Sequence, residues 1–403
     1  MLTHFRNSSL QQMNGPVLVD EAGLPRYWAT VWALLQPADR APSTLAKKLG
    51  HLEGFYEHAE ELLGYGGLDN ALASFDVDAL TGALEGYFLT LNRPPITPST
   101  ERRWQAAFQF VTGTLQRLTR SSTSLEQLEA LNGRLMRHEL LNSHLHVGRD
   151  RRPERIRSLP SEIVEFLYET LDPNSAANPF REGVSRWRVY TIFMLLLHQG
   201  LRRSELLIFP TDVIKSGFDR SLKQERWWMS VRYNEYEDDP RCSRPSIKNA
   251  PSIRQLPVSQ PIALLVQEYV SNYRGRANHS FLINSQKRAP LSTEGVSKMF
   301  QKISASLPQN LRKILRDQTG EESFSAHELR HTCAVVRLNQ ILSSGVEMAD
   351  ALERLRGFFG WCRDSVEPLR YARAVFEDRL ASVWNGKFDD RVDVLRNLPG
   401  RLK

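Results

Sequence analysis

An arginine-rich segment at residues 146–158 divides this chain into two regions with different hydrophobic patterns. Its sequence, HVGRDRRPERIRS, holds five arginines against two acids and one proline, which suits either a solvated linker or a basic strap on a polyanion. Because 403 residues is long for one domain, we expect two, at residues 21–145 and 159–385, joined by this linker. Residues 1–20 are expected to form a leader, and residues 386–403 a C-terminal tail.

The first region, residues 21–145, has the hydrophobic spacing of amphipathic helices. Apolar residues recur at helical intervals in residues 43–64, where Gly64 is expected to end the helix. A second helix is predicted to begin around Pro98, because proline is favoured in the first helical turn. We expect four or five helices in this domain.

The second region, from residue 159 onward, has a mixed pattern. Residues 185–200 are mostly apolar, as in a buried helix, and Gly200 ends that run. Residues 227–233 and 253–259 alternate like strands, and helical patterns resume near residue 261. The predicted fold is therefore mainly α with a small antiparallel β-sheet in the second domain.

Composition narrows the class of protein. The formal charge is +7 and the pI about 9.3, which suits a polyanionic partner. The three cysteines, Cys242, Cys333 and Cys362, form no CxxC pair or disulfide framework, so a reducing compartment is expected. The N-terminus lacks the apolar core of a signal peptide, and the longest apolar run, residues 189–197, is too short to span a bilayer. We therefore expect a cytoplasmic protein without a membrane partner.

The segment HELRH, from His327 to His331, carries the densest set of reactive side chains. Ser325 and Glu328 match a capping box, so a helix is predicted to begin here. His327 and Arg330 then share one face near the helix start, where unpaired N–H groups favour an anion. The segment can therefore be either a phosphate-binding site or an exposed polar helix start.

HELRH is also a literal HExxH, the signature of zinc metalloproteases. Its place at a predicted helix start counts against that function, as does Arg330 beside the would-be metal. The extended form of the signature is absent, since Ala334 and Arg337 follow. A zinc protease is therefore a remote alternative, and no metal is expected.

Four further side chains are weak signals when taken one at a time. Arg202 follows the predicted helix end at Gly200, and Glu205 is close enough to orient it, yet this can be a simple helix junction. Lys248 lies in a polar connection between the two predicted strands and can be a solvated lysine. Trp361 can be a core aromatic, and Tyr371 an ordinary residue of an amphipathic helix.

Taken in order, these segments resemble the tyrosine recombinase family, also called phage integrases. HELRHT is close to the HxLRHT signature of that family, and GLRRSEL matches its first arginine box. Lys248 followed by Arg254-Gln-Leu-Pro257 matches its β-hairpin, and Trp361 in FFGW stands where histidine is usual. Tyr371 falls where the nucleophile belongs. The resemblance covers residues 159–385.

The resemblance implies DNA cleavage and rejoining without ATP, metal or another cofactor. Tyr371 would attack a scissile phosphate, leaving a 3′-phosphotyrosine and a free 5′-hydroxyl. Arg202 and Arg330 would stabilise the charged phosphorane. Lys248 would protonate the leaving oxygen, and His327 would act as the base for Tyr371.

The remaining roles are supporting ones. Trp361 would brace the site, Glu205 would orient Arg202, and His331 would be a supporting partner rather than a catalyst. The two domains would close as a C-shaped clamp on double-stranded DNA, with four protomers on two sites and accessory proteins as further partners. Candidate phosphate contacts are Lys47, Lys48, Arg102, Arg103, Arg149, Arg151 and Arg152.

Two other functions within DNA chemistry remain open. A type IB topoisomerase uses a similar residue set but acts as a monomer. A catalytically idle DNA-binding accessory protein would keep the fold without the reaction. HELRHT and the two-region layout favour a site-specific recombinase, and the intact tyrosine favours an active one. We expect it to integrate, excise or transpose a mobile element and to be associated with the nucleoid.

Overall fold

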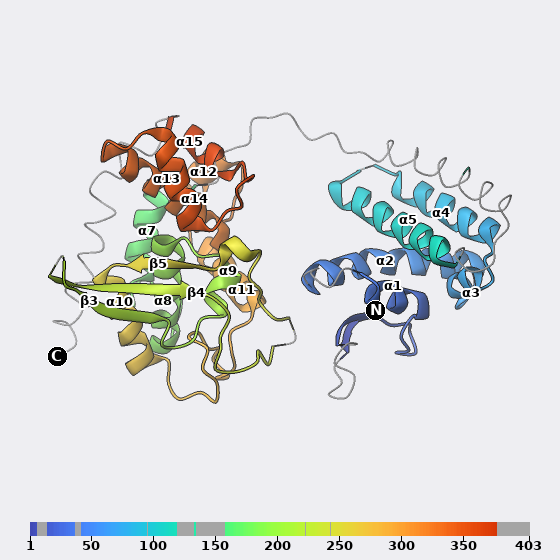
Figure 1. The fold of residues 1–403 in the computed structure, drawn as a ribbon, viewed down its shortest axis with the longest axis horizontal. Coiled ribbons are helices and arrows are strands. Elements are labelled where there is room, and N and C mark those ends of the chain that lie inside the picture. Colours follow the sequence, from blue (N-terminus) through green and yellow to red (C-terminus); the bar gives the residue numbers. More distant parts are fainter. Residues whose placement is uncertain are drawn as a thin grey trace. The chain divides into compact units, whose positions relative to one another are not determined.

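The computed structural model describes residues 1–5, 14–36, 42–94, 96–118, 133, 158–221, 223–241 and 243–376. The chain divides into two compact units, Met1–Arg151 and Arg152–Lys403, each with its own hydrophobic core (Figure 1). Candidate contacts Arg149, Arg151 and Arg152 lie outside the described residues, as does the expected tail at 386–403. No described helix has both the length and the apolar character needed to cross a membrane.

The described part of the first unit is a helical bundle with a short hairpin. Its helices are α1 (Tyr27–Leu34), α2 (Pro42–Leu63), α3 (Gly67–Ala73), α4 (Val77–Leu91) and α5 (Pro98–Leu118). The predicted starts and ends are confirmed, because α5 begins at Pro98 and Gly64 follows α2 with a left-handed φ of +81°. Trp104 and Phe110 of α5 and Tyr56 of α2 are fully buried in the core between these helices.

Residues 1–20 are not simply a leader. Strands β1 (Leu2–Phe5) and β2 (Gly15–Leu18) pair in antiparallel register. Leu18 is fully buried in the core of the helical bundle, and Leu2 packs against that core. The burial of these apolar side chains gives the segment a reason to be ordered, although it is too short to show a clear pattern.

The second unit is mainly helical around a three-stranded sheet. The strands β3 (Ile214–Asp219), β4 (Gln224–Val231) and β5 (Arg254–Val258) are antiparallel in the order β3-β4-β5. The helices are α7 (Ser161–Leu171), α8 (Gly183–Gln199), α9 (Arg203–Leu207), α10 (Gln260–Glu268), α11 (Thr293–Ala305), α12 (Gln309–Thr319), α13 (Ala326–Ser343), α14 (Met348–Phe359) and α15 (Glu367–Phe376). The mainly α fold with a small antiparallel sheet is thus confirmed.

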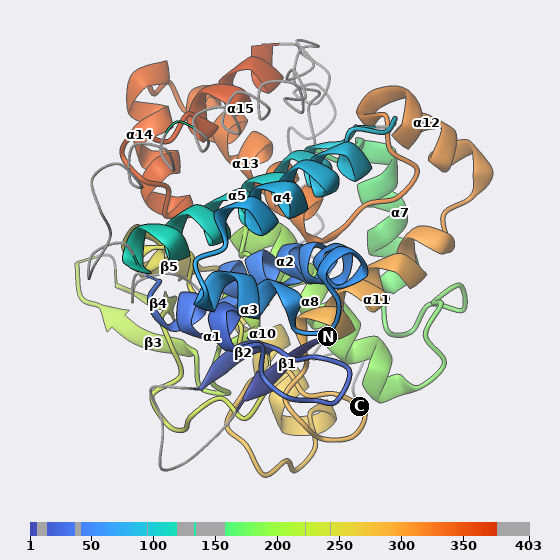
Figure 2. The same ribbon diagram turned by 90° about the vertical axis from the view of Figure 1, so that its right-hand side faces the viewer.

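Helix α8 forms the centre of this unit, and most of its side chains are buried. It packs on α13, which in turn contacts α14 and α15, and these last three helices stay together in both views (Figure 1; Figure 2). Gly200 ends α8 with φ +57°, and a Cβ there would come within 2.4 Å of the Phe359 ring. The same Cβ would lie 3.1 Å from Sγ of Cys333 in α13, so the end of α8, the end of α14 and the first half of α13 meet at one place.

Candidate active site

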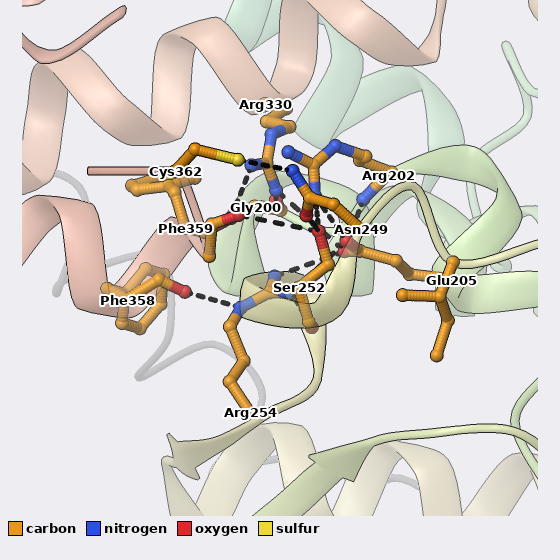
Figure 3. A network of polar contacts seen from close by, with 12 residues as sticks. Gly200, Arg202, Glu205, Asn249, Ser252, Arg254, Arg330, Phe358, Phe359 and Cys362 are labelled. Atoms are coloured by element: carbon orange, nitrogen blue, oxygen red, sulfur yellow. Dashed lines mark hydrogen bonds and ion pairs between the residues drawn. The ribbon is translucent and has the colours of Figure 1, made fainter. Parts of the chain in front are cut away.

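A fully buried carboxylate, that of Glu205, lies at this meeting point (Figure 3). One Nη of Arg202 donates to it at 2.6 Å, and both terminal nitrogens of Arg254 donate to it at 3.1 Å. Arg330 forms a longer ion pair with it, 3.8 Å between Nη1 and Oε2. We call this group of three arginines around Glu205 the arginine cluster.

The local sequence places Arg202 and Glu205 together. Arg202 is the N-cap of α9, and Glu205 is the third residue of that helix. The Glu205 carboxylate accepts the backbone N–H of Arg202 at 2.9 Å, which completes a capping box. The same carboxylate therefore caps the start of α9 and holds the Arg202 side chain.

The charges in the cluster do not cancel. Burial raises the pKa of the Glu205 carboxyl, but the surrounding guanidinium groups, Arg254 foremost, outweigh burial and hold that pKa below its usual value. Burial, and then the charge of Arg202, lowers the pKa of Arg330 to about 9, so this side chain stays protonated at neutral pH. Three positive charges against one negative charge leave a formal +2 at the site.

The carboxyl end of α14 supplies further acceptors. The carbonyl of Phe358 accepts Nε of Arg254 at 2.7 Å, and the carbonyl of Phe359 accepts Nη2 of Arg330 at 2.7 Å. Arg330 also donates to the carbonyl of Gly200. Unpaired carbonyls at a helix end carry partial negative charge, so they stabilise the buried cations without neutralising them.

A 3₁₀ turn, Ala250–Ser252, connects the arginine cluster to the segment that carries Lys248. The hydroxyl of Ser252 accepts from Arg202 at 2.9 Å and donates to the Asn249 side chain. Asn249 directly follows Lys248 in the chain and donates to Sγ of Cys362 at 2.8 Å. The Lys248 side chain is exposed, and it makes no hydrogen bond or ion pair within the part of the chain that the structure describes.

Tyr371 of α15 is buried beside the arginine cluster, with 6% of its surface exposed. Its ring stacks on Trp361 at 5.3 Å between centroids, and Trp361 stacks on Phe359 at 4.8 Å. The Tyr371 hydroxyl shares a short hydrogen bond with Nδ1 of His331. Burial raises the pKa of Tyr371, whereas the charge of Arg330 acts in the opposite direction.

The predicted capping box at the start of α13 is confirmed. Ser325 accepts the backbone N–H of His327, and Glu328 accepts that of Ser325. His327 is exposed, with its ring 4.4 Å from the His331 ring. Both His327 and Arg202 line a hollow of about 890 Å³ that also borders α11 and the end of α12. The hollow gives both side chains access to a ligand from outside.

The HELRH side chains are engaged in ways that do not fit a zinc protease. Glu328, which would be the base, completes the capping box, and His331, which would be a ligand, bonds to Tyr371. Within the described ranges, no three His, Cys, Asp or Glu side chains are grouped so that they could hold a metal ion.

The structure thus brings together Arg202, Glu205, Arg330, His331, Trp361 and Tyr371. His327 lies at their exposed side, and Lys248 lies two residues before the 3₁₀ turn. Arg254 was not predicted to have a role in the site, although it belongs to the Arg-x-x-Pro motif. That motif was the sequence signal for this residue, and its burial beside Glu205 is a finding of the structure.

The candidate phosphate contacts within the described residues belong to the first unit. Lys47 and Lys48 are on α2, and Arg102 and Arg103 are on α5. Burial first, and then Arg103, Arg102 and Lys47, lowers the pKa of His51. Three of these four cations therefore lie close enough to one histidine to affect its pKa.

Residues 174–348 match the family model described as the phage integrase family. These residues therefore form a domain of this family, the tyrosine recombinases, which supports site-specific DNA recombination as the class of activity of this domain. Trp361 and Tyr371 lie beyond the matched residues, so their place in the site rests on their contacts with His331 and Phe359.

The solved structures that resemble this chain include two that are each 12% identical to it in sequence. One is XerA recombinase, with a TM-score of 0.35, covering 88% of this chain and 97% of that chain. The other is the XerH site-specific recombinase bound to a palindromic difH substrate in a post-cleavage complex, with a TM-score of 0.42 and 89% of each chain covered. No curated protein sequence matches the chain.

Proposed function

We propose that this protein is a site-specific DNA recombinase that cleaves and rejoins strands through a 3′-phosphotyrosine intermediate. The observation that carries the proposal is a buried site with a formal charge of +2 next to a tyrosine hydroxyl. A phosphodiester carries one negative charge, and its pentavalent transition state carries a second. Fixed cations therefore favour the transition state over the substrate.

Each step of the reaction has a candidate residue. The Tyr371 oxygen attacks the scissile phosphorus, and Arg202 and Arg330 hold the non-bridging oxygens as charge accumulates. Lys248, exposed and carried by the segment next to the 3₁₀ turn, protonates the leaving 5′-oxygen. His327 faces the hollow of about 890 Å³ and contacts the phosphate from that side. The energy of the phosphodiester stays in the phosphotyrosine bond, so the reaction needs no cofactor.

The DNA partner is bound by both units in this proposal. Lys47, Lys48, Arg102 and Arg103 contact phosphates from the first unit. The arginine-rich segment with Arg149, Arg151 and Arg152 follows the backbone, and the two units close as a C-shaped clamp. A homo-tetramer on two sites would exchange strands, with accessory proteins as further partners, on nucleoid DNA in the cytoplasm. The natural task would be integration, excision or transposition of a mobile element.

Covalent trapping tests this function. Purified protein is mixed with labelled DNA fragments that surround its own gene, quenched with detergent, and digested to identify the DNA-linked peptide. We expect an adduct on Tyr371 through a 3′-phosphate, which Tyr371→Phe abolishes while DNA binding changes by no more than a few-fold. Binding without any adduct from the wild-type protein would favour the catalytically idle accessory role. Relaxation of supercoiled DNA by a monomer would favour the topoisomerase.

A further inference from the structure

His327 was predicted to be the base for Tyr371. The Tyr371 hydroxyl bonds to Nδ1 of His331, which is four residues further along α13. The two rings are tilted by 39° with centroids 5.5 Å apart, so the bond lies near the imidazole edge. The Tyr371 ring is also stacked on Trp361, with the two planes 12° apart. The Tyr371 hydroxyl donates to Nδ1 of His331 in the tautomer in which this nitrogen carries the lone pair of the neutral imidazole.

A buried phenol needs such an acceptor before it can attack phosphorus. Burial raises the pKa of Tyr371, so the hydroxyl is neutral at neutral pH. The charge of Arg330 favours the phenolate but does not overcome burial. Neutral imidazole can take a proton through one ring nitrogen, and Nδ1 of His331 is already in hydrogen-bonding contact with the oxygen that must lose it.

We propose that His331 is the general base that accepts the proton of Tyr371, an inference that rests on the function proposed above. As the Tyr371 oxygen bonds to phosphorus, its O–H bond breaks and the proton passes to the lone pair of Nδ1. The bond from phosphorus to the 5′-oxygen breaks, and that oxygen keeps the electron pair and takes a proton from Lys248. During rejoining, the His331 imidazolium returns the proton to Tyr371 as the phosphotyrosine bond breaks.

The competing role for His331 is purely positional, in which it only fixes the phenol at rest. The two roles predict different results for His331→Asn, because the Asn Oδ1 can stand in the place of Nδ1. That oxygen accepts the same hydrogen bond but takes no proton at neutral pH. A positional role is preserved by this variant, and a base is lost. His331→Ala removes both the bond and the base.

The experiment measures single-turnover formation of the covalent adduct on two substrates. One is ordinary DNA, and the other has sulfur in place of the bridging 5′-oxygen, whose departure as a thiolate needs no acid. We expect both His331 variants to lose about 10²–10⁴-fold in rate on both substrates, the usual contribution of general base catalysis. Lys248→Ala should regain its rate on the sulfur substrate, and added imidazole should restore part of the rate of His331→Ala.

The outcomes that overturn the inference are specific. A near-normal rate for His331→Asn would make His331 a positioning residue, and a faster rate would make it a restraint on the resting tyrosine. Recovery of His331→Ala on the sulfur substrate would place it on the leaving-group side. In each case the wild-type adduct on Tyr371 still forms, so the proposed recombinase function survives. No adduct from the wild-type protein would overturn both.

A second tyrosine–histidine pair provides the matched control. Tyr168 and Nε2 of His198 share a buried hydrogen bond of 2.8 Å in the core between α7 and α8. Tyr168→Phe removes a bond of the same kind without touching the proposed chemistry, and its adduct rate should match the wild type. If His331→Ala unfolds in a thermal melt, His331→Asn, which keeps the bond to Tyr371, still decides between the two roles.

Discussion

Glu205 and Arg254 meet through two parallel hydrogen bonds of 3.1 Å, although their side chains are at most 6% exposed. The two residues are 49 positions apart, one in α9 and the other at the start of β5. A forked pair of this kind fixes the plane of the carboxylate. Arg202 bonds to the same carboxylate, so Arg254 helps to position the Arg202 side chain through Glu205. Arg202 lines the hollow, whereas Arg254 is not among its lining residues.

Glu205→Gln should destabilise the protein in a pH-dependent way. Removing one partner of a buried ion pair costs about 3–5 kcal/mol of unfolding free energy. Because the folded-state pKa of Glu205 is lowered, its stabilisation is present above the usual value near 4.5 and is lost as pH falls through the folded value. Urea unfolding should therefore show a large difference from the wild type at neutral pH that shrinks in acid. A constant difference would mean that Glu205 does not titrate with this cluster.

Arg202→Ala and Arg254→Ala should differ in their effects on the rate of adduct formation and on the free energy of unfolding. Arg202 is the more exposed of the two, and its loss should slow adduct formation by at least ~100-fold, as expected for a group that stabilises transition-state charge. Arg254→Ala leaves Glu205 short of its forked partner and should lower the unfolding free energy as well. Arg254→Lys keeps the charge without the fork, so a full recovery in that variant would show that charge alone suffices.

Gly360→Ala should disturb the arginine cluster indirectly, through the 3₁₀ turn at Ala250–Ser252. Gly360 has φ +60°, and an added Cβ would lie 2.7 Å from the carbonyl oxygen of Pro251 and 2.8 Å from Cα of Ser252. We expect a loss of about 1–3 kcal/mol and slower adduct formation, because the 3₁₀ turn that bonds Arg202 must shift. Gly357→Ala is the matched control, since a Cβ there meets nothing within 4 Å and the position is helical. It should stabilise the protein by about 0.5–1 kcal/mol in urea unfolding.

Replacing both Arg102 and Arg103 with glutamine should weaken DNA binding and make the binding constant less dependent on salt concentration. Each lost phosphate contact lowers the slope of log K against log salt by about 0.9, so the double variant should lose about 2 from the slope. Arg117→Gln, at the other end of α5, is the control. Equal slopes for the wild type and the double variant, measured by fluorescence anisotropy across a salt series, would remove this surface from the interface.

The sequence predicted those features that depend on neighbouring residues. The capping box of Ser325 and Glu328, the end of α2 at Gly64 and the start of α5 at Pro98 are local, and each is confirmed. Strand β3 was missed, because KSGF within it contains a glycine and alternates poorly, and its pairing with β4 determines the strand.

The parts of the site that were missed depend on contacts across long stretches of chain. The hydrogen bond between Arg254 and the Phe358 carbonyl spans 104 residues, and the residues next to Arg254 in the sequence do not predict it. The position of Tyr371 against His331, rather than His327, depends on how α15 packs on α13. Periodicity places the two histidines on one face but does not say which one another helix will reach.

The arginine cluster also affects the order in which the contacts of the second unit form during folding. Arg330 contacts Gly200 across 130 residues, and Arg254 contacts Phe358 across 104. Closing such long loops lowers the chain entropy before the contacts can stabilise the fold. These hydrogen bonds are therefore expected to form late in folding. Until these contacts form, the three arginines are not arranged beside Tyr371. In the proposed reaction, strand cleavage therefore requires the completed domain.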